Sequence, residues 1–207
     1  LPHMLRLSTL LLVLAVSISH AQTTQTVSSP NGNIVVHFFI SDKGVPTYNA
    51  TYKKKIFIEN SALGFAIKEN FGSTLIVSPA DAFVVTGTET ASNKSTWQPV
   101  WGDVKEITDE HNKLVLHLAQ QKNNPIRIDV VFKVFNDGFG FRYEFPKQEH
   151  LQHFTVVDEK TEFHLTGNHK AFWIPGDYDS NEFNPMTTSL SEVDASISKT
   201  YDAINTK

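Results

Sequence analysis

The sequence predicts an all-β fold, in the form of a β-sandwich or barrel. Its 207 residues are 40% hydrophobic and 11% aromatic, which is enough for one sizeable core. Fifteen Phe residues beside only two Met favour a strand-rich interior packed with aromatic rings. Short alternating stretches recur with turn signals about every 8 to 12 residues, a spacing typical of sandwiches and barrels.

Composition excludes several classes of function. The net charge is −4 and the pI is about 6.1, which argues against nucleic-acid binding because phosphate contacts need clustered Lys and Arg. The one basic cluster, at residues 53–55, is interpreted as a hairpin tip or strand edge. The absence of Cys from the sequence excludes disulfides, thiolate catalysis, zinc–Cys sites and a Cys-anchored lipid.

The N-terminal residues resemble a secretory signal peptide. Arg6 follows the expected start at Met4, residues 7–18 are mostly apolar, and small residues lead to predicted cleavage after Ala21. The apolar run is short for a membrane span. We therefore expect residues 1–21 to be a signal peptide with a few upstream residues, and an exported β-sandwich domain over 23–207.

The first half of that domain alternates in short stretches. Residues with one shared face, such as Ile34, Val36 and Phe38, indicate half-buried strands between Gly- and Pro-containing turns. The predicted strands are 33–40, 47–53, 56–58 and 61–67, with further candidates at 74–77 and 82–85. The polar residues 86–95 are predicted to form a loop.

Two tryptophans flank a proline in residues 95–102. Trp97 and Trp101 are interpreted first as a packed aromatic corner. The alternative is a platform for stacking sugars, since a Trp face suits the apolar face of a pyranose ring.

The strongest strand signal is a long hairpin over residues 126–145. Its first strand is apolar on both faces, which predicts a central position in a sheet, and residues 136–138 form its turn. A preceding strand is predicted at 113–119. Arg142 and Glu144 lie opposite the aromatic face of the second strand, and we expect them to be cross-strand ion partners rather than catalysts.

An acidic loop follows a further strand near the C-terminal end. Strands are expected at 154–158 and 162–165, and then an apolar run that a sheet could bury ends at Pro175 and Gly176. Asp177, Asp179 and Glu182 follow, and they suit either a hard-cation or sugar-facing site or an ordinary solvated turn. Residues 186–207 show no strong strand, and we expect the chain to be part of something longer.

Three separated motifs resemble the N-terminal domain of glycoside hydrolase family 97. They are residues 97–102, 135–146 and 171–179, supported by 29–32, 44–48 and 63–64. The resemblance spans about residues 27–193 and implies a β-super-sandwich like that of galactose mutarotase, truncated at its C-terminal end. It also implies that a catalytic (β/α)8 barrel and a small β domain, both absent from this chain, follow in the parent protein.

The resemblance implies a calcium-dependent α-glycosidase whose catalytic carboxylates are on the barrel, so no catalytic residue is expected here. Glu182 matches the position from which the family's N-terminal domain supplies one calcium ligand, while Asp177 and Asp179 are expected to cap the loop. Calcium takes 6–8 oxygen ligands, so the remaining ligands would come from the barrel.

The preferred function is the N-terminal domain of a periplasmic or otherwise exported α-glucosidase acting on starch-derived oligosaccharides, inactive when alone. The alternatives are an α-galactosidase of the same family, or a non-catalytic carbohydrate-binding sandwich using Trp97, Trp101 and Trp173. The expected partners are the barrel and, through it, an oligosaccharide. The nine His residues, among them His117, are interpreted as surface or satisfied core residues rather than a metal cluster.

Overall fold

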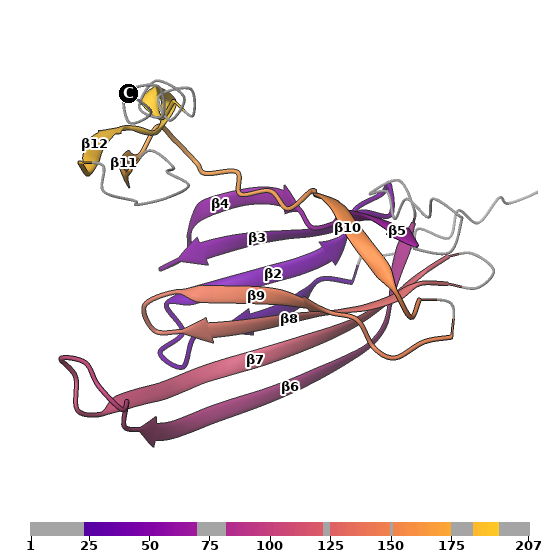
Figure 1. The fold of residues 1–207 in the computed structure, drawn as a ribbon, viewed down its shortest axis with the longest axis horizontal. Coiled ribbons are helices and arrows are strands. Elements are labelled where there is room, and N and C mark those ends of the chain that lie inside the picture. Colours follow the sequence, from indigo (N-terminus) through magenta and orange to yellow (C-terminus); the bar gives the residue numbers. More distant parts are fainter. Residues whose placement is uncertain (1–22, 70–81, 122–124, 150, 175–183, 195–207) are drawn as a thin grey trace, which may run out of the picture.

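The computed structural model describes residues 23–69, 82–121, 125–149, 151–174 and 184–194. Their secondary structure is all-β apart from one short 3-10 helix, η1, which confirms the predicted fold class (Figure 1). The strands are β1 (Gln25–Ser28), β2 (Ile34–Ile40), β3 (Pro46–Tyr52), β4 (Lys55–Ala62), β5 (Phe65–Glu69), β6 (Phe83–Trp97), β7 (Ile107–Gln120), β8 (Arg127–Phe135), β9 (Phe139–Glu144), β10 (Phe154–Glu159), β11 (Lys170–Trp173) and β12 (Met186–Ser189), and η1 is Leu190–Glu192.

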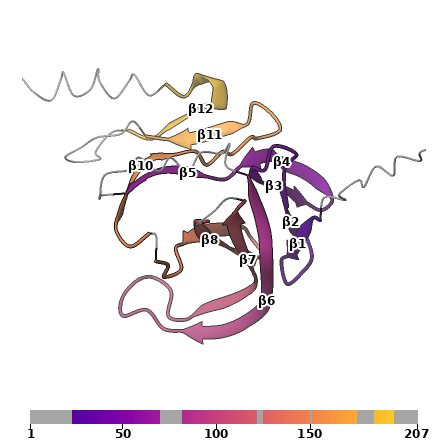
Figure 2. The ribbon, with the colours of Figure 1, turned by 90° about the vertical axis from the view of Figure 1, so that its right-hand side faces the viewer.

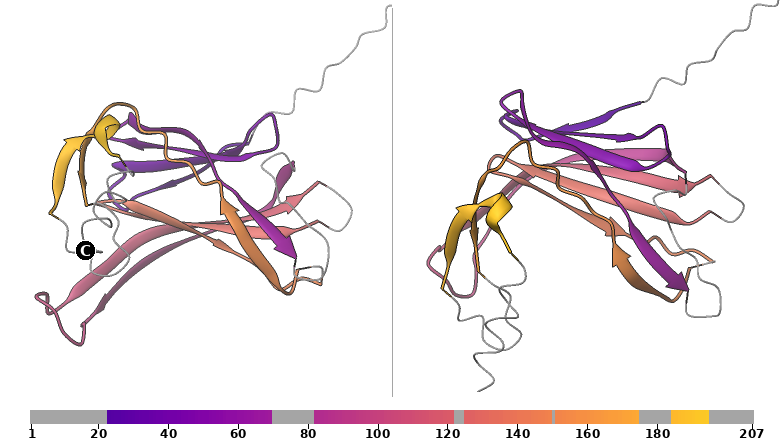
Figure 3. Two further views of the ribbon diagram at one scale, coloured as in Figure 1. Left: turned by 45° about the horizontal axis from the view of Figure 1, so that its top comes forward. Right: turned by 90° about the horizontal axis from the view of Figure 1, so that it is seen from above.

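Two four-stranded antiparallel sheets stack to form the sandwich (Figures 2 and 3). Their strand orders are β1-β2-β3-β4 and β6-β7-β8-β9, so each strand pairs with its neighbour in sequence. Alternate residues point between the sheets because side chains of a strand alternate with a period of two. The shared core takes Val36, Phe38, Tyr48 and Ala50 from the first sheet and Leu114, Leu116, Val130, Phe132 and Val134 from the second.

An aromatic cluster fills the centre of this core. The Phe132 ring lies 6.4 Å from Phe38, 6.1 Å from Tyr48 and 5.5 Å from Phe141, centroid to centroid. Tilted arrangements at these distances suit the quadrupoles of the rings. Several of the Phe residues that are abundant in the sequence therefore pack here, between the two sheets.

The predicted tight turns of the first sheet are confirmed. Gly44 has φ +77°, and a Cβ built on it would lie 2.4 Å from the Cα of Ala82, so both its conformation and its space require glycine. Lys53 and Lys54 form the turn between β3 and β4 at φ +47° and +67°, which matches the predicted hairpin tip.

The prediction of a loop at residues 86–95 is wrong. This stretch belongs to β6, which pairs with β7 from Phe83 to Trp97. Both faces of its second half are largely exposed, because β6 and β7 extend past the first sheet (Figure 1). The sequence of this half does not alternate between apolar and polar residues, because neither face packs on the core. Hydrogen bonds to β7 nevertheless hold its backbone extended.

The long hairpin of β8 and β9 is confirmed. The Phe135 N–H donates to the Gly138 carbonyl over 2.8 Å and closes the predicted turn. β8 lies between β7 and β9, as expected for a strand that is apolar on both faces, and Val131 on its outer face is buried. Arg142 pairs with Glu144, but along β9 rather than across strands.

Other strands differ from expectation, among them β1, which was not predicted. The predicted strand at 61–67 is divided between β4 and β5, residues 162–165 make a single bridge from Leu165 to Ile58 rather than a strand, and β12 was not predicted. β5 pairs with β10, and β11 pairs with β12. The signal peptide and the predicted strand at 74–77 lie outside the described residues.

Among the helices of the described part of the chain, none is long and apolar enough to span a membrane.

Candidate functional site

The strand that leads into the acidic loop forms as predicted, while the loop itself lies outside the described residues. β11 pairs with β12 in a two-stranded hairpin that stands at one end of the sandwich (Figure 1). The expected burial of this run is wrong, since Phe172 is 78% exposed and Ile174 is 42% exposed. Asp177, Asp179 and Glu182 all belong to residues 175–183, so their side chains are not placed.

An irregular segment, residues 160–165, runs beside β4 and leads along the chain to β11. Its backbone is tied at alternate residues, because Lys160 N donates to Gly64 O at 2.8 Å and Glu162 N donates to Ala62 O at 2.9 Å. Side chains add to this: Ala62 N donates to the Glu162 carboxylate at 2.8 Å, and His164 N donates to Ser61 Oγ at 2.9 Å. The segment is thus fixed without being a regular strand.

Two tyrosines anchor the same segment from the core. The fully buried Tyr48 donates its hydroxyl to the Glu162 carbonyl over 3.0 Å, and burial raises the pKa of Tyr48 to about 12. Tyr143 shares a hydrogen bond with Thr161 Oγ1 at 2.8 Å and accepts one from Gly64 N at 3.0 Å. Burial also raises the pKa of Tyr143, so both phenols remain protonated and neutral.

The three tryptophans occupy two separate places. Trp97 ends β6 and is 53% exposed, and Trp101 in the following turn is 89% exposed. The preferred interpretation of a packed aromatic corner is therefore wrong for this chain, because residues 98–106 project beyond the core that would cover them. Trp173 is half-buried on β11 and donates its indole N–H to Thr188 Oγ1 on β12 at 3.0 Å.

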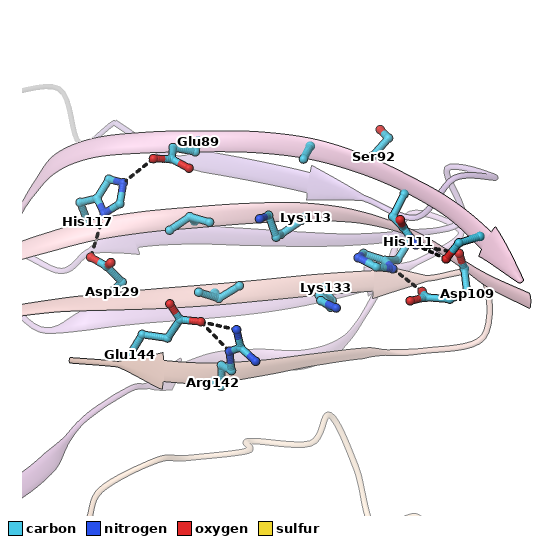
Figure 4. Close-up of a pocket in the computed structure, with 15 residues that line it drawn as sticks. Glu89, Ser92, Asp109, His111, Lys113, His117, Asp129, Lys133, Arg142 and Glu144 are labelled. Carbon is cyan, nitrogen blue, oxygen red and sulfur yellow. Dashed lines mark hydrogen bonds and ion pairs between the residues drawn. The ribbon is translucent and has the colours of Figure 1, made fainter. Parts of the chain in front are cut away.

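A polar hollow lies on the outer face of the β6–β9 sheet, opposite the sandwich core (Figure 4). It has a volume of about 670 Å³ and takes residues from all four strands. Its lining is Glu89, Ala91, Ser92, Asn93, Ser95, Asp109, His111, Lys113, Val115, His117, Asp129, Val131, Lys133, Arg142 and Glu144. No sequence pattern predicts this hollow, because its residues come together only through the register of the four strands.

Charged side chains in the hollow form local pairs. His117 contacts Asp129 through Nδ1 at 2.8 Å and Glu89 through Nε2 at 3.3 Å, and the hydrogen bond to Asp129 raises its pKa above the usual value of 6.5. His111 contacts Asp109 at the other end. These contacts place two of the nine histidines in carboxylate pairs on the sheet surface or just beneath it.

Within the described ranges, no group of three or more His, Asp or Glu side chains is arranged to hold a metal ion. Glu182, the one calcium ligand that the family resemblance implies for this domain, lies outside these ranges.

Comparison with known proteins identifies the domain. The family model of the glycosyl-hydrolase 97 N-terminal domain matches residues 27–204. A glycoside hydrolase family 97 enzyme from Pseudoalteromonas sp. strain K8, solved with panose, is 33% identical with a TM-score of 0.70 over 81% of this chain. The same enzyme in complex with acarbose gives 34% identity and a TM-score of 0.69 over 80% of the chain.

A β-arabinopyranosidase shares the fold at 24% identity, with a TM-score of 0.62 over 73% of this chain and 23% of its own. The chain spans about a quarter of the length of the Pseudoalteromonas enzymes, 25% and 24% in the two complexes. The match covers the sandwich, the β11–β12 hairpin and the acidic loop between them. This chain therefore belongs to the glycosyl-hydrolase 97 N-terminal domain family.

Proposed function

We propose that this chain is the N-terminal domain of an exported, calcium-dependent α-glycosidase, with an α-glucosidase acting on starch-derived oligosaccharides as the specific form. The domain braces a (β/α)8 barrel and supplies one calcium ligand, Glu182. The match of the family model over residues 27–204 carries this proposal. The complexes of a relative with panose and acarbose support an oligosaccharide substrate for the parent enzyme.

The arrangement of β11 supports the role of Glu182. Residues 160–165 are tied to the first sheet by backbone and side-chain hydrogen bonds, and β11 and β12 flank residues 174–185. Both flanks of the stretch that contains Glu182 are therefore held by paired strands. In the parent, that carboxylate would share the ion with ligands of the barrel.

Glycoside hydrolysis needs two carboxyl groups placed on either side of the scissile bond. We propose that both carboxyl groups come from the barrel, while the N-terminal domain packs against the barrel and contributes the negative charge of Glu182 to the calcium site. An α-galactosidase of the same family is the sibling alternative, and the acid and base residues of the parent decide between them.

A carbohydrate-binding sandwich without catalysis is a second candidate, and one observation favours it. Trp97 and Trp101 are 53% and 89% exposed on this chain, which leaves much of each residue accessible to a sugar. Titration of the 207-residue chain with maltotriose, followed by Trp fluorescence, tests this candidate. A saturable change that Trp101→Ala removes would support it.

Two measurements test the main proposal. The purified chain alone should not hydrolyse 4-nitrophenyl α-glucoside, because the catalytic carboxylates are on the barrel. Turnover by the chain alone would contradict the proposal.

In the parent enzyme, Glu182→Ala should raise the calcium concentration needed for half-maximal activity about 10-fold or more, as expected for loss of one charged ligand (10-fold is about 1.4 kcal/mol). The control is Glu106→Ala, an exposed carboxylate in the β6–β7 turn, which should leave calcium dependence unchanged. Equal calcium curves for wild type and Glu182→Ala would refute the role of that residue.

A further inference from the structure

The hollow on the β6–β9 sheet holds two lysines that face each other across strands. In the antiparallel register of β7 and β8, Lys113 pairs directly with Lys133. Both side chains are half-buried, and both lie in the middle of the hollow (Figure 4). Like charges directly opposite each other destabilise a sheet, so this pair has an electrostatic cost that an anion would remove.

Every carboxylate that lines the hollow already has a basic partner. His117 holds both Asp129 and Glu89, Arg142 holds Glu144, and His111 holds Asp109. Among the described residues, neither lysine ammonium group makes an ion pair or a hydrogen bond. Neither lysine is therefore tied to one of the carboxylates that line the hollow.

The space over the lysines is open because their lateral neighbours are small. The register aligns Ala91 of β6, Lys113, Lys133 and Gly140 of β9 in one row across the sheet. A Cβ built on Gly140 would meet nothing within 4 Å, so the hollow is open at that end of the row. Its volume of about 670 Å³ lies in the range of roughly 300–1,000 Å³ typical of small-molecule sites.

The rest of the lining indicates the chemistry of the ligand. Asn93 and Ser95 on β6 bring amide and hydroxyl groups to the rim, and the ion pairs add further polar atoms. Such a lining suits a hydroxyl-rich molecule better than an apolar one, and the two ammonium groups suit a carboxylate. We propose that this hollow binds a saccharide that carries a carboxylate, with Lys113 and Lys133 holding that group between them.

This site goes beyond the proposed function, because it lies on the chain itself and requires neither the barrel nor calcium. Its test is calorimetric titration of the full 207-residue chain with D-glucuronate and with D-glucose, which differ at C6. We expect glucuronate to bind at least 10-fold more tightly than glucose, and inorganic phosphate to bind more weakly than glucuronate. Glucose binding as tightly as glucuronate, or phosphate doing so, would overturn the proposal, as would the absence of glucuronate binding.

Substitutions assign the site. Lys113→Ala combined with Lys133→Ala should lower glucuronate affinity at least 10-fold, while Lys94→Ala should change it less than 2-fold. Lys94 is the matched control because it lies on β6 outside the hollow and pairs with Glu110 at 3.1 Å. Lys133→Glu offers a second readout, because an opposite charge facing Lys113 should raise the Tm of the ligand-free chain while abolishing binding. Glucuronate binding that survives either set of substitutions in a folded chain would refute the assignment.

Discussion

The hydroxyl of Tyr48 offers the sharpest test of how residues 160–165, the segment that leads to β11, are held in place. Tyr48→Phe removes one oxygen and leaves the ring among Phe132, Phe141 and the other aromatic neighbours, so no large cavity forms. What is lost is the 3.0 Å hydrogen bond to the Glu162 carbonyl, which ties β3 to the segment that leads to β11. The change removes this connection between the core and the segment, together with the contact of the hydroxyl with the Ser61 side chain.

The magnitude follows from the surroundings of that bond. A typical intramolecular hydrogen bond contributes about 0.5–1.5 kcal/mol net, and leaving a buried partner unsatisfied costs about 1–3 kcal/mol. Glu162 is exposed, so water can replace the lost donor at its carbonyl, and we expect a loss near 1 kcal/mol. Phe132→Ala, which does open a cavity at the centre of the core, should instead cost about 3–5 kcal/mol.

Urea denaturation with an unchanged m-value measures both losses. Hydrogen exchange should also show faster exchange of the Glu162 and His164 amides in Tyr48→Phe, since these N–H groups hold the segment against β4. The control is Tyr52→Phe, whose ring is 46% exposed and which should stay within about 0.5 kcal/mol of wild type. If Tyr48→Phe matches this control in stability and in exchange, the hydroxyl does not hold the segment.

Three further predictions concern other parts of the sandwich. The contact with Asp129 raises the pKa of His117, so the stability that protonated His117 contributes is complete below the usual pKa of 6.5 and is lost as the pH rises through the raised pKa. His117→Gln should therefore lower the Tm more at pH about 5.5 than at pH about 8.5. A larger loss of Tm at the higher pH would contradict this. Trp101→Ala should change the free energy of unfolding, measured in urea, by less than about 0.5 kcal/mol, because the residue is 89% exposed, and a larger loss would show that the ring is packed. Gly44→Ala should lower the free energy of unfolding by about 2–5 kcal/mol, because φ is positive there and the new Cβ would clash with the backbone of Ala82. Gly32 also has a positive φ but lies in open space, so Gly32→Ala should lower it by only about 1–2 kcal/mol. Equal losses for the two variants would exclude the clash.

Alternation in the sequence was sufficient where a strand packs on the core. β2 and the β8–β9 hairpin were predicted within one or two residues because burial selects apolar side chains at every second position. The second half of β6 could not be predicted in this way. Its residues project past the first sheet, so neither face is selected for apolarity, and only pairing with β7 makes it a strand.

The two candidate sites also differ in how far the sequence alone can predict them. The acidic residues of the loop stand out in sequence because they follow an apolar strand and a Pro-Gly break, and Glu182 was singled out through the family resemblance. The hollow leaves no such signal. Lys113 and Lys133 are twenty residues apart in the numbering and become neighbours only through the register of β7 and β8, which sequence patterns alone do not fix.

The two faces of β7 show why the hollow can be tested without disturbing the fold. Leu114, Leu116 and Leu118 point into the core and are buried, whereas Lys113 and His117 point outward into the hollow. A change on the outer face removes no core contact and creates no cavity, so its effect on stability is confined to local charge. Loss of ligand binding in such variants would therefore be due to the missing charge itself. A sandwich whose outer-face residues must stay fixed for folding would instead lose stability and binding together, and that outcome would count against a binding role for this face.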